Sequence, residues 1–219
     1  MNLLHRLLRL LFPPKCVLCG HVLSDEETDL CHCCRTDTPD FPESRRKLTH
    51  IASWTALWHY EGTVRTSLLR YKFGNRRSYA EIYGRLLAMR LLRHGIRFDH
   101  LTWVPTARLR KWRRGYDQVE LIAKATAREL GVTPIPLLKK LRNNPPQSGI
   151  SGAAQRRANV LGVYKVLTPE KIQGKRILLL DDIITTGATV SECARVLLTA
   201  GAGEVLCAAV AASHEHKNQ

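Results

Sequence analysis

The chain has 219 residues, a length that allows one domain of ordinary size with a small appendage and excludes two full enzymes. Its 34 Lys and Arg residues against 19 Asp and Glu give a net charge of +15, which favours a polyanionic partner. Nucleic acid, a phosphate-rich ligand and an anionic membrane surface all satisfy that condition. No run approaches the roughly 18–20 apolar residues that a membrane-spanning helix needs, which excludes an integral membrane protein.

The first twelve residues combine leucines at helical spacing with the basic residues His5, Arg6 and Arg9. These basic residues interrupt the apolar stretch that a signal peptide needs, so we expect a cytoplasmic protein. The segment is either a basic amphipathic helix that lies on the inner face of the membrane or on a partner, or a helix packed on its own domain. The sequence leaves both interpretations open.

Four cysteines near the N-terminus form two C-x2-C pairs with eleven residues between the pairs. Two such pairs can place four thiolates around one Zn²⁺, and four thiolates close the coordination shell, so we expect a structural or partner-docking metal. A disulfide pair or free thiols are less favoured, because cytosolic thiols stay reduced. His32 and Cys33 lie inside the second pair, so the ligand there could differ by one position. The predicted zinc ligands are Cys16, Cys19, Cys31 and Cys34.

Beyond a predicted linker at residues 41–51, segments with strand and helix periodicity alternate along the chain. Such alternation predicts a mostly parallel sheet flanked by helices. The chain is therefore divided into an N-terminal helix and zinc module at 1–40, the linker, and an α/β domain at 52–219. The expected strands cover 52–60, 100–104, 133–138, 176–180 and 204–212, and the expected helices cover 62–70, 79–94, 118–130 and 189–200.

Two of these helices have a predicted inner face, and one predicted loop is long. Residues 142–160 hold two prolines and two glycines without a long apolar period, which predicts a mobile loop of the kind that covers sites in α/β domains. The inner faces are predicted to consist of Ile82, Leu86, Met89 and Leu92 in the first helix, and of Val119, Ile122, Ala123 and Thr126 in the second.

The segment RILLLDDIITTGAT, residues 176–189, combines an apolar strand, two carboxylates, a turn of small residues and the start of a helix. The carboxyl end of a parallel strand lies at the crevice where open α/β sheets bind ligands. Asp181 and Asp182 can there accept hydrogen bonds from vicinal sugar hydroxyls or help to hold a Mg²⁺. The hydroxyls and backbone N–H groups of Thr185–Thr189 suit a phosphate at a helix N-terminus. A turn that only caps the helix is the weaker interpretation, because it gives two adjacent carboxylates no purpose.

This segment resembles the phosphoribosyl pyrophosphate-binding motif of type I phosphoribosyltransferases, in which paired acids hold the ribose and a Thr/Gly loop holds its 5′-phosphate. Over nearly its whole length the chain resembles the ComF family of competence-associated, phosphoribosyltransferase-like proteins. The double cysteine pair, the segments YEGTVRTSLLRYKFGN from Tyr60 and VPTARLRKWRRGYDQVELIAKA from Val104, and the stretch 147–160 carry that resemblance. Asp117 is a difference, since the family usually has Asn there.

The resemblance implies a type I phosphoribosyltransferase-like fold for residues 52–219, with a structural Zn²⁺ and with Mg²⁺ bound beside phosphoribosyl pyrophosphate. The turn 105–108 would bind pyrophosphate, often through a cis peptide, and Arg108, Arg113, Arg114 and Lys72 are candidates to neutralise it. A solvated surface charge is an equally good interpretation of each of these cations. Asp181 and Asp182 are the expected catalytic residues. The expected cofactor-binding residues are Thr185, Thr186, Gly187, Ala188, Thr189, Arg108 and Lys72.

For function, the resemblance implies a cytoplasmic protein that binds phosphoribosyl pyrophosphate or a related phosphosugar and assists DNA uptake in natural transformation, beside a helicase-like competence protein. One alternative is an active Mg²⁺-dependent phosphoribosyltransferase that transfers ribose 5-phosphate to a nucleophile that the sequence does not identify. A second alternative is an adaptor that binds single-stranded DNA through the basic run 110–114, which contains Trp112. The third is a docking module on an inert domain, which the intact Asp181 and Asp182 disfavour.

Overall fold

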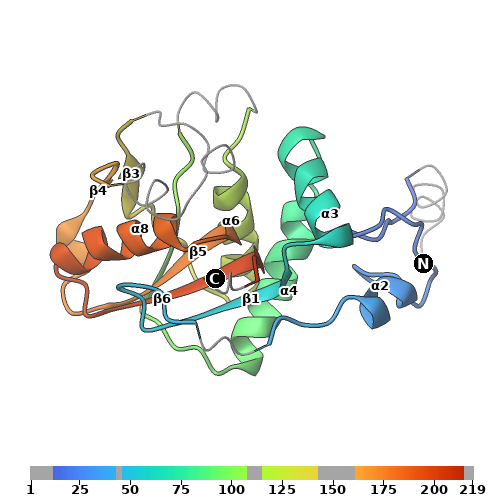
Figure 1. The fold of residues 1–219 in the computed structure, drawn as a ribbon, viewed down its shortest axis with the longest axis horizontal. Helices are drawn as coiled ribbons and strands as arrows, with labels where there is room; N and C mark the ends of the chain where they lie inside the picture. The colour runs from blue at the N-terminus through green and yellow to red at the C-terminus, as the bar shows by residue number, and fades with distance from the viewer. Residues whose placement is uncertain (1–11, 43–45, 108–114, 143–160, 215–219) are drawn as a thin grey trace, which may run out of the picture.

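The computed structural model describes residues 12–42, 46–107, 115–142 and 161–214, which form an α/β domain with a small cysteine-rich module at its N-terminal side (Figure 1). Four parallel strands make the central sheet in the order β1-β6-β5-β2, which confirms the predicted parallel sheet. These strands are β1 (Ser53–His59), β2 (His100–Trp103), β5 (Arg176–Ile184) and β6 (Glu204–Ala212). The helices are α2 (His32–Asp37), α3 (Gly62–Phe73), α4 (Tyr79–Arg93), α6 (Gln118–Glu129) and α8 (Ala188–Thr199).

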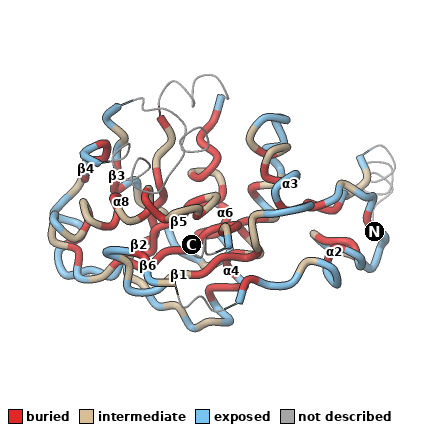
Figure 2. The backbone as a smooth tube through the Cα atoms, viewed as in Figure 1, coloured by how far each residue is buried: buried red, intermediate tan, exposed pale blue. Residues whose placement is uncertain are grey.

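The central strands β5 and β6 are buried because helices cover both faces of the sheet (Figure 2). Successive side chains of a strand point to opposite faces, and along β5 Leu178 and Leu180 enter one core whereas Ile177 and Leu179 enter the other. Helices α4 and α6 contribute to the first core, and α8 contributes to the second. A strand that is covered on both faces needs a continuous run of apolar residues rather than an alternating pattern.

Helix α4 corrects one prediction about packing. Its buried face includes Tyr83, Leu87 and Leu91, whereas Met89 and Leu92, which were predicted to face inward, are 52% and 67% exposed. The cause is the close packing of α4 on α6, in which a side chain at Gly84 would collide with Ala125. The inner face of α6 is as predicted, with Val119, Ile122, Ala123 and Thr126 all buried.

One predicted strand is displaced along the chain. Residues 133–137 contain Pro134 and Pro136, which lack the N–H groups that a ladder needs, and the strand β3 (Leu138–Lys140) begins only after them. It pairs antiparallel with β4 (Tyr164–Val166), a strand that the sequence analysis missed, in a separate two-stranded sheet. The short α2 and the 3₁₀ turn Pro169–Lys171 were also missed.

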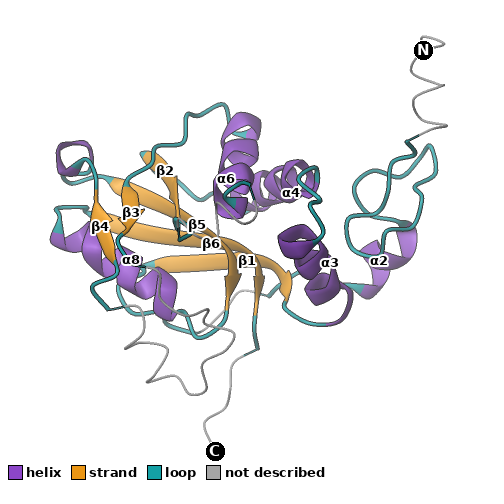
Figure 3. Cartoon of the chain, turned by 90° about the horizontal axis from the view of Figure 1, so that it is seen from above, coloured by secondary structure: helices purple, strands orange, loops and turns teal. Residues whose placement is uncertain are grey.

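The segment predicted as a linker packs along the domain. Phe41 and Leu48 are buried in it, and Phe41 N–H donates to the carbonyl of Leu57 at 2.7 Å. Arg90 of α4 reaches from the other side and donates to the carbonyl of Phe41. Figure 3 shows the cysteine-rich module beside α3, at the end of the molecule remote from α8. The described parts of this segment therefore pack on the domain at Phe41 and Leu48.

Several sequence-based predictions fall on residues outside the described ranges. They are the N-terminal helix, the basic run 110–114 and nearly all of the loop 142–160. Within the ranges that are described, every helix is too short or too polar to cross a membrane.

Candidate functional site

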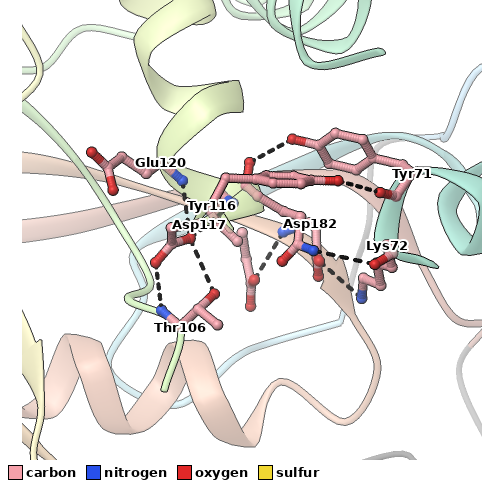
Figure 4. Close-up of polar contacts among 10 residues, drawn as sticks. Tyr71, Lys72, Thr106, Tyr116, Asp117, Glu120 and Asp182 are labelled. Atoms are coloured by element: carbon pink, nitrogen blue, oxygen red, sulfur yellow. Dashed lines mark hydrogen bonds and ion pairs between the residues drawn. The ribbon is translucent and has the colours of Figure 1, made fainter. Parts of the chain in front are cut away.

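The candidate site lies where β5 ends, with Asp181 and Asp182 as its acidic part. The two side chains leave the strand toward opposite sides, and Asp182 N–H donates to Asp181 Oδ1 at 2.8 Å. Asp182 Oδ2 forms an ion pair with Lys72 Nζ at 2.8 Å, which Figure 4 shows as a contact between β5 and α3. The structure thus brings together three of the predicted site residues from segments more than 100 positions apart.

Asp181 is the most deeply placed acid of the site, with 7% of its surface exposed. Burial raises its pKa to about 8, with the nearby charge of Asp182 acting in the same direction. A carboxyl group that is protonated near neutral pH can both donate and accept hydrogen bonds, as a sugar hydroxyl also can. Placing a buried acid here has a cost in stability, which a purely structural turn would not explain.

Lys72 is held in place by a network of buried aromatic residues. Tyr71, which precedes it on α3, is fully buried and donates from its hydroxyl to the carbonyl of Gln118 at 2.8 Å. Tyr116 donates from its hydroxyl to the carbonyl of Tyr71 at 2.9 Å, and Gln118 Nε2 donates to the carbonyl of Lys72. These bonds join the end of α3 to the start of α6 (Figure 4). The backbone at Lys72 is therefore anchored between α3 and α6, and its ammonium group pairs with Asp182.

The loop Thr185–Thr189 forms a small pocket at the N-terminus of α8. Asp181 and residues 183–190 line this pocket, so one carboxylate and the loop face the same space. Gly187 has φ +79°, a left-handed conformation that suits glycine, and it directly precedes the first residue of α8. The N–H groups of the first turn of a helix lack partners within that helix, and they carry partial positive charge. The geometry suits an anion.

Arg46 is a residue of this site that the sequence analysis missed. Its Nη2 donates to the carbonyl of Thr185 at 2.7 Å, and its guanidinium lies 5.4 Å from the ring centre of Trp54. Trp54 in turn donates from Nε1 to the carbonyl of Arg46 at 2.8 Å. A side chain at Gly187 would collide with Leu48 and would lie 3.3 Å from Arg46 Nη2. The segment before β1 thus supports the loop and brings a positive charge to it.

The turn after β2 is held by a buried acid, Asp117. Asp117 caps α6 by accepting from the N–H groups of Val119 and Glu120, and it also accepts from the N–H and hydroxyl of Thr106 at 2.8 and 3.0 Å. Burial raises its pKa. The described peptide bonds, which include those of residues 105–107, are all trans. Arg108, Arg113 and Arg114 lie outside the described residues.

The four cysteines predicted as zinc ligands converge in the N-terminal module. Their sulfur atoms all lie within 4.8 Å of one another, and Cys19 Sγ is 3.6 Å from Cys31 Sγ. Tetrahedral zinc with Zn–S bonds of about 2.3 Å requires sulfur atoms roughly 3.8 Å apart, so the donor set fits this metal. His32 and Cys33 are exposed and do not belong to the cluster. The two C-x2-C pairs therefore meet, as their spacing predicts.

Two protein families match this chain, one at its N-terminal module and one in its α/β domain. Residues 7–45 match the double zinc ribbon domain, and residues 120–219 match the phosphoribosyl transferase domain. The second match contains β5, the loop and α8, whereas Lys72 and Arg46 lie outside it.

Curated relatives match most of the chain. Competence protein F of Haemophilus influenzae is 26% identical over 87% of this chain and 93% of its own length. DNA utilization protein YhgH of Escherichia coli K12 is 28% identical over 88% of this chain and 94% of its own. The ribose-phosphate pyrophosphokinase of Gloeobacter violaceus is 34% identical, but over only 40% of this chain and 22% of that protein. The chain is therefore a ComF-type homologue of Competence protein F and YhgH, in which a double zinc ribbon precedes a phosphoribosyl transferase domain.

Proposed function

We propose that this protein binds phosphoribosyl pyrophosphate, or a closely related phosphosugar, together with Mg²⁺, and that it acts in DNA uptake. The observation that supports this choice of ligand is that Asp181 and the loop at the N-terminus of α8 line the same pocket. A ligand with a phosphate at one end and sugar hydroxyls next to it matches that arrangement. The match to the phosphoribosyl transferase domain and the similarity to a ribose-phosphate pyrophosphokinase support the same chemical class.

Each part of the site has a role in this proposal. The loop Thr185–Thr189 holds the 5′-phosphate through its N–H groups and hydroxyls, and Asp181 and Asp182 accept hydrogen bonds from the ribose hydroxyls. Lys72 supplies a positive charge for the pyrophosphate end. Carboxylate oxygens are hard ligands of the type that Mg²⁺ prefers, so the site fits that ion, and Asp181 would release its proton on binding it. When bound, the ion would neutralise pyrophosphate charge.

Isothermal titration of the full chain with phosphoribosyl pyrophosphate and Mg²⁺ tests this proposal. We expect binding to the wild type and its loss in the double variant Asp181→Ala plus Asp182→Ala. An Asp99→Ala variant is the matched control, because Asp99 accepts from Arg176 N–H at the opposite end of β5. Equal binding by the wild type and the double variant would place the ligand elsewhere, and no binding by the wild type would remove the ligand proposal.

Contact with DNA is the second part of the proposal. The net charge of +15 favours a polyanion, and relatives over most of the chain are named Competence protein F and DNA utilization protein. We expect the protein to bind single-stranded DNA with an affinity that falls steeply between 50 and 200 mM salt, as counterion release requires. The variant Arg113→Ala plus Arg114→Ala should bind more weakly. Binding that does not respond to salt would exclude a backbone contact of this kind.

A further inference from the structure

Helix α3 contacts the zinc module directly. Ser67 donates from its hydroxyl to the carbonyl of Val17, and Arg70 donates to the carbonyls of Leu18 and Cys19. All three carbonyls belong to residues 16–20, which we call the first knuckle because it contains the first cysteine pair. Two side chains one turn apart on α3 therefore hold the backbone of a zinc-binding turn.

The contact between α3 and the first knuckle is closely packed. Val17 and Leu18 have no exposed surface, and a side chain at Gly20 would lie 2.9 Å from Arg70 Nη1. The hydroxyl of Ser67 also lies 2.7 Å from the hydroxyl of Tyr83, which ties the same contact to α4. The carbonyls of the first knuckle keep these positions only while the turn keeps its shape. A metal bound between its cysteines supplies that constraint, because a module this small has little core of its own.

The last turn of the same helix also reaches the candidate ligand site. Lys72 follows Arg70 by two positions and forms the ion pair with Asp182 at 2.8 Å. Tyr71 lies between them and is fully buried against α6. Figures 1 and 3 both show α3 between the zinc module and the sheet. Three consecutive residues thus join the first knuckle to the acid at the end of β5.

We infer that zinc binding and phosphosugar binding are linked through α3, so that loss of zinc weakens the ligand site. This inference rests on the proposed function for its ligand. The element with two states is the first knuckle, which holds α3 when its metal is bound and releases the contacts of Ser67 and Arg70 when it is not. Arg70 is then a positioning residue, because its side chain bonds to the zinc module and acts on the ligand through Lys72. Linkage between two binding sites is reciprocal, so a bound phosphosugar must also raise the affinity of the protein for zinc.

A second attachment keeps the zinc module on the domain when Arg70 is changed. Arg85 of α4 forms a bidentate ion pair with Asp29, in which Nε lies 2.9 Å from Oδ2. Asp29 belongs to the segment between the two cysteine pairs, and this contact does not involve α3. The variant Arg70→Met should therefore remove the link without detaching the module. Arg65→Met is the matched control, because Arg65 is exposed on the same helix and its side chain forms no bond with the described residues.

The first experiment measures the zinc affinity of the full chain by competition with a coloured chelator, with and without saturating phosphoribosyl pyrophosphate and Mg²⁺. We expect the phosphosugar to raise the zinc affinity on the order of fivefold in the wild type and in Arg65→Met. In Arg70→Met the phosphosugar should bind several-fold more weakly and should not change the zinc affinity. Equal zinc affinities with and without bound ligand in the wild type would overturn the inference.

Hydrogen exchange separates this inference from the proposed function. If the wild type binds no phosphosugar, the proposed function fails, but the link from zinc to α3 can still be measured in the ligand-free protein. Removal of zinc should then speed amide exchange in the second half of α3, at residues 67–73, and leave α8 unchanged. The same slow exchange in α3 with and without zinc would show that the metal does not support the helix, and the inference would fall.

Discussion

Lys72 Nζ lies 2.8 Å from Asp182 Oδ2, which joins helix α3 to the end of strand β5. This pair is largely shielded from water, with 20% of one side chain and 14% of the other exposed. A lysine that is held against an acid can turn to an anionic ligand when hydroxyl groups of that ligand occupy the acid. The first prediction follows from this position.

Replacing Lys72 by Met should weaken binding of phosphoribosyl pyrophosphate at least about tenfold, because one charge-assisted contact is worth roughly 1.5–3 kcal/mol. Titration calorimetry measures the change. Lys124→Met is the control, since Lys124 pairs with Glu120 on the exposed side of α6. Unchanged affinity in Lys72→Met would show that the pair with Asp182 has a structural role only.

Replacing Asp181 by Asn should stabilise the protein, and the gain should grow as the pH rises. The pKa of Asp181 is raised from 3.8 to about 8, so between these values the folded chain holds a proton that the unfolded chain has lost. The contribution of Asp181 to the free energy of unfolding therefore falls with increasing pH, by at most about 1.4 kcal/mol per pH unit. Asn at position 181 does not titrate, and it can still accept from the N–H of Asp182.

Urea unfolding of both proteins at pH 4, 6 and 8 measures this effect. The difference in unfolding free energy should be small at pH 4 and largest at pH 8. A difference that stays constant over this range would mean that Asp181 ionises normally in the folded protein.

Replacing Arg46 by Met should weaken ligand binding by roughly tenfold, which corresponds to about 1.4 kcal/mol. The variant loses the hydrogen bond to the carbonyl of Thr185 and the positive charge beside the phosphate loop. Arg176→Met removes the same charge at the other end of β5, where Arg176 pairs with Glu204, and should bind normally. Titration with ribose 5-phosphate isolates the phosphate end. Equal losses in the two variants would point to net charge rather than to the loop.

Substitutions of Asp117 should rank in stability as Asp, then Asn, then Ala. Asp117 accepts four hydrogen bonds, from Thr106 and from the first turn of α6. Asn is as good an N-cap as Asp and keeps the bonds to Oδ1, whereas Ala loses them all at a cost of about 1–2 kcal/mol. Thermal unfolding gives the ranking. An Ala variant as stable as the wild type would show that the cap is not needed.

The parts of the site that the sequence predicted are those encoded by local patterns. The two cysteine pairs specify a metal cluster by spacing alone, and the apolar run before Asp181 marks a buried strand whose end must reach the crevice. Arg46 could not be found in this way, because it lies in a polar segment without periodicity and reaches Thr185 from 139 positions away. The prediction for α4 was wrong at Met89 and Leu92, because apolar residues occupy most sides of that helix and only its contact with α6 decides which are buried.

The most direct measurement of the central claim is a crystal structure of the full chain grown with phosphoribosyl pyrophosphate and Mg²⁺. We predict the 5′-phosphate within hydrogen-bond distance of the loop Thr185–Thr189 and the ribose hydroxyls at Asp181 and Asp182. A phosphosugar bound at any other surface, with this loop empty at a saturating ligand concentration, would contradict it.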